Sequence, residues 1–134
     1  MAKRKDRRAG QSLAELAIVL PLLLIVTFGI IDAGRLIYNY NAVSLSAREG
    51  VRWAVVRGAT SGRPASASDI SNVVQSMSAG VPVNGSVAWD PPGNNQPGSA
   101  VVVTVQNDFA PFAHFPMVPS TIRLASTSRM IIAR

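Results

Sequence analysis

The sequence predicts an α+β protein, in which a long N-terminal transmembrane helix continues into a small domain with a second short helix and an antiparallel three-stranded sheet. Three observations predict this fold class. An uncharged apolar run follows a basic N-terminus. Apolar residues then continue at three- and four-residue spacing beyond that run. Toward the C-terminus the pattern changes to segments rich in β-branched residues, separated by stretches dense in Pro and Gly.

The charge of the chain is concentrated at its N-terminus. The 134 residues carry a formal net charge of +6. Most of that excess lies in the first eight residues, where a single acidic residue, Asp6, accompanies Lys3, Arg4, Lys5, Arg7 and Arg8. A basic tail beside an apolar run is a topology signal rather than a phosphate-binding face, so we expect no nucleic-acid partner. The chain has no cysteine, which excludes disulfides and thiolate metal sites. Its single histidine, His114, argues against a histidine-based metal site or catalytic triad.

The apolar run extends from Leu16 to Ile31 and contains no charge. Its length of about 16 residues corresponds to roughly 24 Å of helix, somewhat less than the bilayer core of about 30 Å. Extension back to Gln11 gives about 21 residues, enough to span. The extension places Glu15 inside the apolar segment, and Asp32 and Arg35 close its other end.

Several interpretations compete for this segment. A buried core helix is disfavoured because no other helix in the sequence could wrap it. A cleaved secretory signal fits the basic start, but the residues near Ile31-Asp32-Ala33 match a small-x-small cleavage site poorly. An uncleaved anchor is a further interpretation. A fourth depends on Glu15.

A carboxylate at the position of Glu15 costs a few kcal/mol in lipid unless it is paired or protonated. In one interpretation Glu15 lies near the headgroups and reaches back to water. In the other it meets a cation at the same depth. Cleavage after Gly10 would create an α-amino group on Gln11 and make Glu15 the fifth residue of the shortened chain. In a packed array of such helices, the amine of one subunit could neutralise the carboxylate of a neighbour and fix the axial register.

The same residues carry a resemblance to a known family. The basic segment, Gly10, Gln11-Ser12-Leu13-Ala14-Glu15 and the apolar run are similar to the class III signal of type IV pilins and pseudopilins. More specifically, the first 55 or so residues resemble the TadE-like family of tight-adherence pseudopilins. The further matching elements are Leu20-Pro21, the Gly29/Asp32/Gly34-Arg35 cluster and the segment Ala47-Arg48-Glu49-Gly50-x-Arg52.

This resemblance implies a pilin-like fold and a division of the chain into three parts. Residues 1–10 would be a basic leader peptide, 11–35 a transmembrane helix and 36–134 an extracytoplasmic domain. It implies cleavage by a prepilin peptidase between Gly10 and Gln11. It also implies partnership with other pseudopilins or pilus assembly proteins, with oligomers formed through the N-terminal helix. The expected location is the inner membrane, single-pass, with the N-terminus cytoplasmic, and an extracellular pilus after assembly.

Beyond the membrane the helical pattern continues to about Arg57, and Gly58 is the expected stop. One face of this half is apolar, with Leu36, Tyr40, Val43, Ala47, Val51 and Ala54. Asp32 with Arg35, and Glu49 with Arg52, have the i,i+3 spacing of surface ion pairs. The cluster of Arg48, Glu49 and Arg52 is either a solvated helix face or a contact surface. Pro21 is either a simple kink or a flexible point used in extraction from the bilayer.

The remaining elements follow from caps and alternation. Asp69 is the expected N-cap of a second helix with an apolar face of Ile70, Val73, Val74 and Met77, and Gly80 its C′ residue. Strands are expected at 83–89, 100–106 and 122–133. The segment 110–119 contains three prolines and cannot be a regular element. The apolar residues within it and just before it could complete the core or form a partner-binding patch: Phe109, Phe112, Phe115, Met117 and Val118.

No catalytic constellation is present in the sequence. His114 has no neighbouring nucleophile or metal-ligand spacing, and we interpret it as an exposed or packed histidine. We expect a protein that is not an enzyme and uses no cofactor. The leading hypothesis is a minor pseudopilin or membrane assembly component of a tight-adherence (Flp, type IVc) pilus or secretion system. The alternative is an unprocessed single-pass adaptor whose outer domain binds another protein. An anchored extracytoplasmic enzyme is the least favoured.

Overall fold

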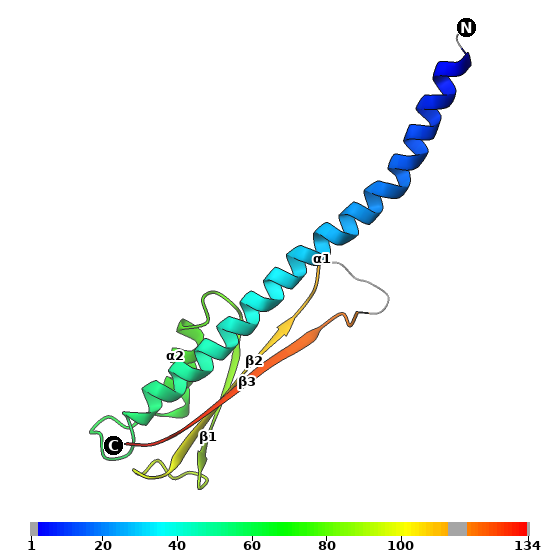
Figure 1. Ribbon diagram of the computed structural model, residues 1–134. Helices are drawn as coiled ribbons and strands as arrows, with labels where there is room; N and C mark the ends of the chain where they lie inside the picture. Colours follow the sequence, from blue (N-terminus) through cyan, green and yellow to red (C-terminus); the bar gives the residue numbers. More distant parts are fainter. Residues whose placement is uncertain (1–2, 113–117, 134) are drawn as a thin grey trace.

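A computed structural model describes residues 3–112 and 118–133, with side chains from Gly10 onward. The elements follow in the order α1 (Lys3–Val55), α2 (Ala67–Ser76), β1 (Asn84–Asp90), β2 (Ala100–Phe109) and β3 (Ile122–Ile131). The C-terminal half of α1 lies along the sheet, whereas its N-terminal half projects away from the rest of the chain (Figure 1). The predicted α+β, pilin-like arrangement of a long apolar helix, a short helix and a three-stranded antiparallel sheet is confirmed.

The helix α1 is about 80 Å long at the usual rise of 1.5 Å per residue. It begins at Lys3 rather than at the expected Gln11, because the basic segment is rich in residues that favour helix. It ends at Val55, two residues before the expected Arg57. Other segments take carbonyl groups at this end and just beyond it: Ala133 N–H donates to Val55 O at 3.2 Å and Ala65 N–H to Arg57 O at 2.7 Å.

The second helix begins one turn earlier than the sequence suggested. Ser66 is the N-cap of α2, and Asp69, the expected cap, is the third helical residue of a capping box. Ser66 Oγ accepts the Asp69 N–H at 3.2 Å, while the Asp69 carboxylate accepts the Ser66 N–H at 3.1 Å. The C-cap is Met77, so the prediction that Gly80 is the C′ residue is wrong. Gly80 instead lies in the following turn with a φ of 82°, next to Ala79 with a φ of 52°.

The strands form one antiparallel sheet in the order β1-β2-β3, so the chain meanders. Val103 in the central strand pairs with Val87 on one side and with Ser128 on the other. Strand β2 runs three residues further than predicted, because its polar end, Asn107 and Asp108, stays paired with β3. A polar pair at the end of a strand weakens the apolar alternation from which the boundary was predicted.

The core lies between the sheet and the two helices. Val101, Val103 and Val105 of β2 are fully buried, and they face α1 and α2. The buried stripe of α1 consists mainly of small residues, which let the helix lie close to the sheet: Ala42, Val43, Ser46, Ala47, Gly50, Val51 and Ala54. The predicted apolar faces are wrong at two positions, since Tyr40 and Met77 remain about half exposed. Tyr40 is too large for that close approach, whereas Met77 is the C-cap of α2, where the helical periodicity ends.

Candidate functional site

The N-terminal half of α1 has no protein surface to pack against. Its large apolar side chains are 45% exposed or more, among them Leu13 at 67% and Ile18 at 75%. By length and composition this helix could cross a membrane, with a mean hydropathy of 2.5 in its most apolar window. Apolar surface of this extent is strongly unfavourable in water, at about 25 cal/mol per Å². The helix therefore requires lipid or other helices around it, which suggests membrane anchoring.

Near the start of this helix lie the residues of the predicted processing and register sites. Gly10, Gln11 and Glu15 are all exposed. The Gln11 side-chain amide donates to Glu15 Oε1 at 3.3 Å across one helical turn. A neutral amide can share the carboxylate but cannot neutralise it. The charge of Glu15 therefore remains to be balanced in any apolar surrounding.

Pro21 lies inside α1, and the helix continues through it. Its ring nitrogen cannot donate to the carbonyl one turn earlier, which removes one hydrogen bond from the helix. The helix curves gently in this half (Figure 1). Further along, Thr27 Oγ1 donates to Leu23 O at 2.8 Å, so its hydroxyl is satisfied within the helix itself.

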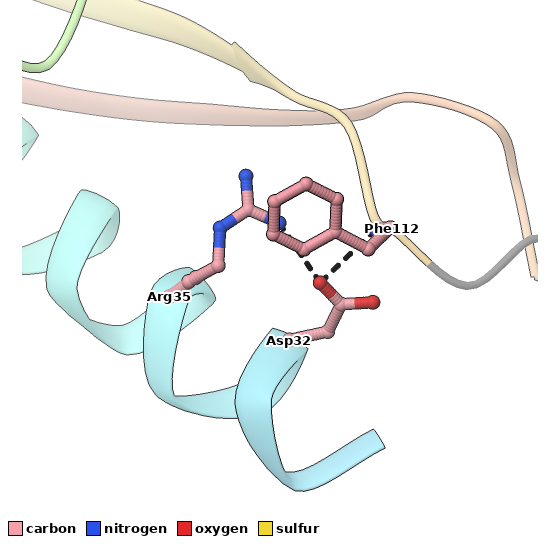
Figure 2. A network of polar contacts seen from close by, with 3 residues as sticks. All are labelled: Asp32, Arg35 and Phe112. Atoms are coloured by element: carbon pink, nitrogen blue, oxygen red, sulfur yellow. Dashed lines mark hydrogen bonds and ion pairs between the residues drawn. The ribbon is translucent and has the colours of Figure 1, made fainter. Parts of the chain in front are cut away.

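The end of the apolar run is tied to the domain by Asp32 and Arg35. Arg35 Nη1 donates to Asp32 Oδ1 at 2.9 Å, and the same oxygen accepts the backbone N–H of Phe112 at 3.1 Å (Figure 2). The guanidinium of Arg35 lies 3.9 Å from the centre of the Phe112 ring and 5.1 Å from that of Phe109. The predicted i,i+3 pair is present, and it also holds the chain that leaves β2. We call Asp32, Arg35 and Phe112 the junction cluster.

Two hollows flank the junction cluster. The larger, about 760 Å³, lies between α1 and the segments 79–82 and 107–110. Tyr38 borders it and donates its hydroxyl to Ala79 O at 2.9 Å. The smaller, about 200 Å³, is lined almost entirely by apolar residues of α1 and of the chain around β2 and β3: Gly29, Ala33, Leu36, Phe109, Pro111, Val118 and Ile122, with Asp32 at its edge.

The aromatic residues after β2 have separate environments. Phe109 is buried in the domain at 3% exposure, whereas Phe112 is 66% exposed. Phe115, Met117 and His114 lie outside the described residues. The core interpretation of this group is therefore confirmed for Phe109 and wrong for Phe112. The sequence could not reveal that Phe112 meets Asp32, since the two are 80 positions apart.

The remaining predicted residues lie on the solvent side of α1. Arg48 and Arg52 are exposed and Glu49 is partly exposed. Arg52 Nη1 lies 3.9 Å from Glu49 Oε1, the predicted spacing of a surface pair. Such an exposed pair contributes little stability. Within residues 3–112 and 118–133, no group of three or more His, Cys, Asp or Glu side chains could hold a metal ion.

Together these features define a class of protein: a pilin-like α+β chain whose long N-terminal helix is half embedded in a small domain and half uncovered. Residues 10–52 match the family model described as TadE-like protein. Over this segment, about a third of the chain, the protein is similar to the TadE-like family. Searches of curated proteins and of solved structures found no match. The matched segment contains Gly10, Glu15, the junction residues Asp32 and Arg35, and most of the buried stripe of α1.

Proposed function

We propose that this protein is a minor pseudopilin, or a membrane assembly component, of a tight-adherence pilus or secretion system. The observation that carries the proposal is the uncovered apolar half of α1 with one carboxylate, Glu15, near its start. A simple anchor gains nothing from a charge there, whereas an assembling helix can use it to select register. The role is structural rather than enzymatic, and the partners are other pseudopilins or pilus assembly proteins.

In this proposal the chain is first inserted with its basic end in the cytoplasm and its domain on the other side of the inner membrane. A prepilin peptidase then cleaves between Gly10 and Gln11. Gly10 supports this step in two ways. It is exposed, and glycine weakens a helix by roughly 0.5–1 kcal/mol relative to alanine, which eases local opening for the peptidase. The new amino group of Gln11 then lies one turn from Glu15, on the same helix face.

Within one chain, Glu15 accepts a hydrogen bond from the Gln11 side chain. Between chains, a shift of one helix along its neighbour by about one turn would bring the amine of one subunit to the carboxylate of the next. Pairing neutralises both charges in the apolar interior, and a misaligned helix leaves both unpaired. The energetic difference, a few kcal/mol for each charge, favours one register.

Mass spectrometry tests the processing step. The protein is produced in a membrane with its cognate peptidase, and in parallel with an inactive peptidase. The active enzyme should yield a chain starting at Gln11, lighter by about 1.2 kDa through loss of the basic leader. An intact Met1 start under both conditions would contradict processing and support the unprocessed adaptor instead.

A further inference from the structure

The chain that leaves β2 contacts α1 at Asp32, the residue that ends the apolar run. Ile31 is the last residue of the apolar run and Asp32 is the first charge after it. From Leu13 to Ile31 the helix has about 19 residues, or roughly 28 Å, which matches the thickness of a bilayer core. If α1 spans the membrane, as the proposed function requires, Asp32 lies at the boundary of the hydrocarbon on the side of the domain.

The junction cluster places Phe112 at that same boundary. Its backbone N–H donates to Asp32 Oδ1 at 3.1 Å, so the two residues share one depth. The Phe112 ring is not packed into the domain, since the residue is 66% exposed. Figure 2 shows the ring beside the guanidinium of Arg35, with the carboxylate of Asp32 below both. An exposed aromatic ring next to an arginine is the combination found where proteins meet the headgroup region.

Val118 extends this surface along the boundary. It is 41% exposed and lines the smaller apolar hollow together with Gly29. Gly29 precedes Asp32 by three residues, which is roughly 4.5 Å deeper along the helix. No Cβ fills the space at Gly29, and the position is open to beyond 4 Å. The hollow extends along α1 from Gly29 to Leu36, so it straddles the boundary, and its lower end reaches the upper acyl chains with an apolar lining that fits hydrocarbon.

We infer that Phe112 and Val118 form a second membrane contact, which inserts into the leaflet on the domain's side next to α1. The inference rests on the proposed membrane anchoring of α1 and is continuous with that anchor. The occupant is the bilayer: acyl chains against Val118 and the apolar hollow, and headgroups around Arg35. Interfacial insertion of this kind buries apolar surface without adding a spanning segment. It also limits the tilt and rotation of the domain on its helix.

Spin labelling tests this inference cleanly, because the chain contains no cysteine that would need to be removed. Single variants Phe112→Cys and Val118→Cys of the full chain are labelled with a nitroxide. They are reconstituted in vesicles of phosphatidylethanolamine and phosphatidylglycerol at low protein-to-lipid ratio. Two reference sites use the same label: Leu23→Cys in the apolar run, and Gln75→Cys on the exposed side of α2. The measurement is label accessibility to oxygen, which dissolves in lipid, and to a water-soluble nickel chelate.

The expected result is an oxygen-to-nickel ratio at positions 112 and 118 at least about three-fold above that at position 75, with position 118 closer to position 23. Ratios equal to that at position 75, with position 23 in lipid, would overturn the inference and leave the anchor intact. A label at position 23 that behaves like position 75 would instead refute the anchoring itself. Shielding of positions 112 and 118 from both reagents would also overturn the inference, because a second copy of the chain would then cover them.

Discussion

Gly50 is a point of close approach between α1 and the rest of the core. A Cβ at this position would meet Val74 Cγ2 at 2.7 Å and Val103 Cγ1 at 3.4 Å. The neighbours belong to α2 and to the middle of β2, so one glycine governs how closely three elements approach. Sequence periodicity could not identify it, because glycine contributes nothing to an apolar pattern.

The substitution Gly50→Ala should therefore destabilise the domain, although alanine favours helix more than glycine does. We expect a loss of about 1–3 kcal/mol in the free energy of unfolding, the usual cost of overpacking a dense core. Near-UV circular dichroism of the protein in detergent can follow unfolding, since Trp53 and Trp89 both pack against the core.

The matched control is Gly34→Ala, the same change in the same helix. No atom lies within 4 Å of a Cβ at Gly34, so only the gain in helix propensity of up to about 1 kcal/mol remains. We expect the two variants to shift stability in opposite directions. Equal effects at both positions would show that Val74 yields easily and that the close contact is unimportant.

Asp69 gives the domain a local dependence on pH. The hydroxyl and backbone N–H of Ser66 bond to its carboxylate and hold the pKa of Asp69 below its ordinary value of 3.8. A lowered pKa in the folded state means that ionised Asp69 stabilises α2. This contribution is fully present above about pH 3.8 and is lost as the pH falls through the lower folded value.

The comparison of wild type with Asp69→Asn isolates this contribution from the other carboxylates. We expect the variant to be less stable at pH 7, because Asn carries no charge for the N-terminus of α2. The difference should shrink at pH 3 and below. Amide hydrogen exchange in residues 67–76 reports it directly. A difference that does not change with pH would mean that Asp69 acts only through its shape.

At the scale of elements, Asp32 joins the helix to the chain after β2. One of its oxygens accepts two hydrogen bonds, and its side chain is only 12% exposed. A second acid–base pair, Asp108 with Arg123, has a similar distance of 3.1 Å, but both of its side chains are more than half exposed. Partial burial strengthens the first pair, whereas solvent weakens the second. The donor–acceptor distances alone would suggest that the two pairs are equally strong.

The variant Asp32→Ala should release the segment around Phe112, which follows β2, from α1. Loss of a charged acceptor costs about 1–2 kcal/mol in local opening, or roughly a ten-fold faster exchange of the Phe112 amide proton. The measurement is hydrogen exchange by nuclear magnetic resonance in micelles. In the control Asp108→Ala, the same amide should exchange within about two-fold of the wild-type rate. Comparable acceleration in both variants would argue against a specific role of Asp32.

The order and type of the elements were predictable because the signals that specify them are local. Apolar periodicity defined α1, β-branched residues defined β2, and dense proline and glycine defined the loops. Boundaries were less predictable, since they depend on partners elsewhere. Ser66 and Asp69 are both acceptable N-caps in isolation. Ser66 is the N-cap of α2 because the Asp69 carboxylate can then accept the backbone N–H of Ser66. The junction cluster needed a contact across 80 positions, for which the sequence carries no signal.

At the scale of the whole molecule, α1 has two kinds of surface. From Ala42 onward one face is buried by the sheet and by α2, whereas the large apolar side chains from Leu13 to Ile31 are all 45% exposed or more. The packed half contributes to the core and so stabilises the domain. The uncovered half leaves the molecule incomplete as a monomer in water, and in the assembly that we propose Glu15 gives this helix a specific pairing partner.

The charge of Glu15 should therefore affect assembly and not insertion. The variant Glu15→Gln keeps the size and polarity of the side chain but cannot pair with an amine. We expect it to insert as well as wild type or better, because a neutral amide costs less in lipid than a carboxylate. Recovery in assembled complexes should fall by about ten-fold or more, equivalent to about 1.4 kcal/mol of lost pairing. The measurement is co-purification of processed chains with their partners from membranes.

The matched control is Glu49→Gln, the same chemical change in the same helix. Glu49 belongs to the domain half and lies 3.9 Å from Arg52 in an exposed pair, so its loss should leave both folding and assembly close to wild type. If Glu15→Gln assembled normally, the carboxylate would not set the register, and it would serve only as a group that reaches back to water. If both variants failed, the domain half of α1 would itself be an assembly surface. The two substitutions thus separate an interaction within the membrane from one outside it.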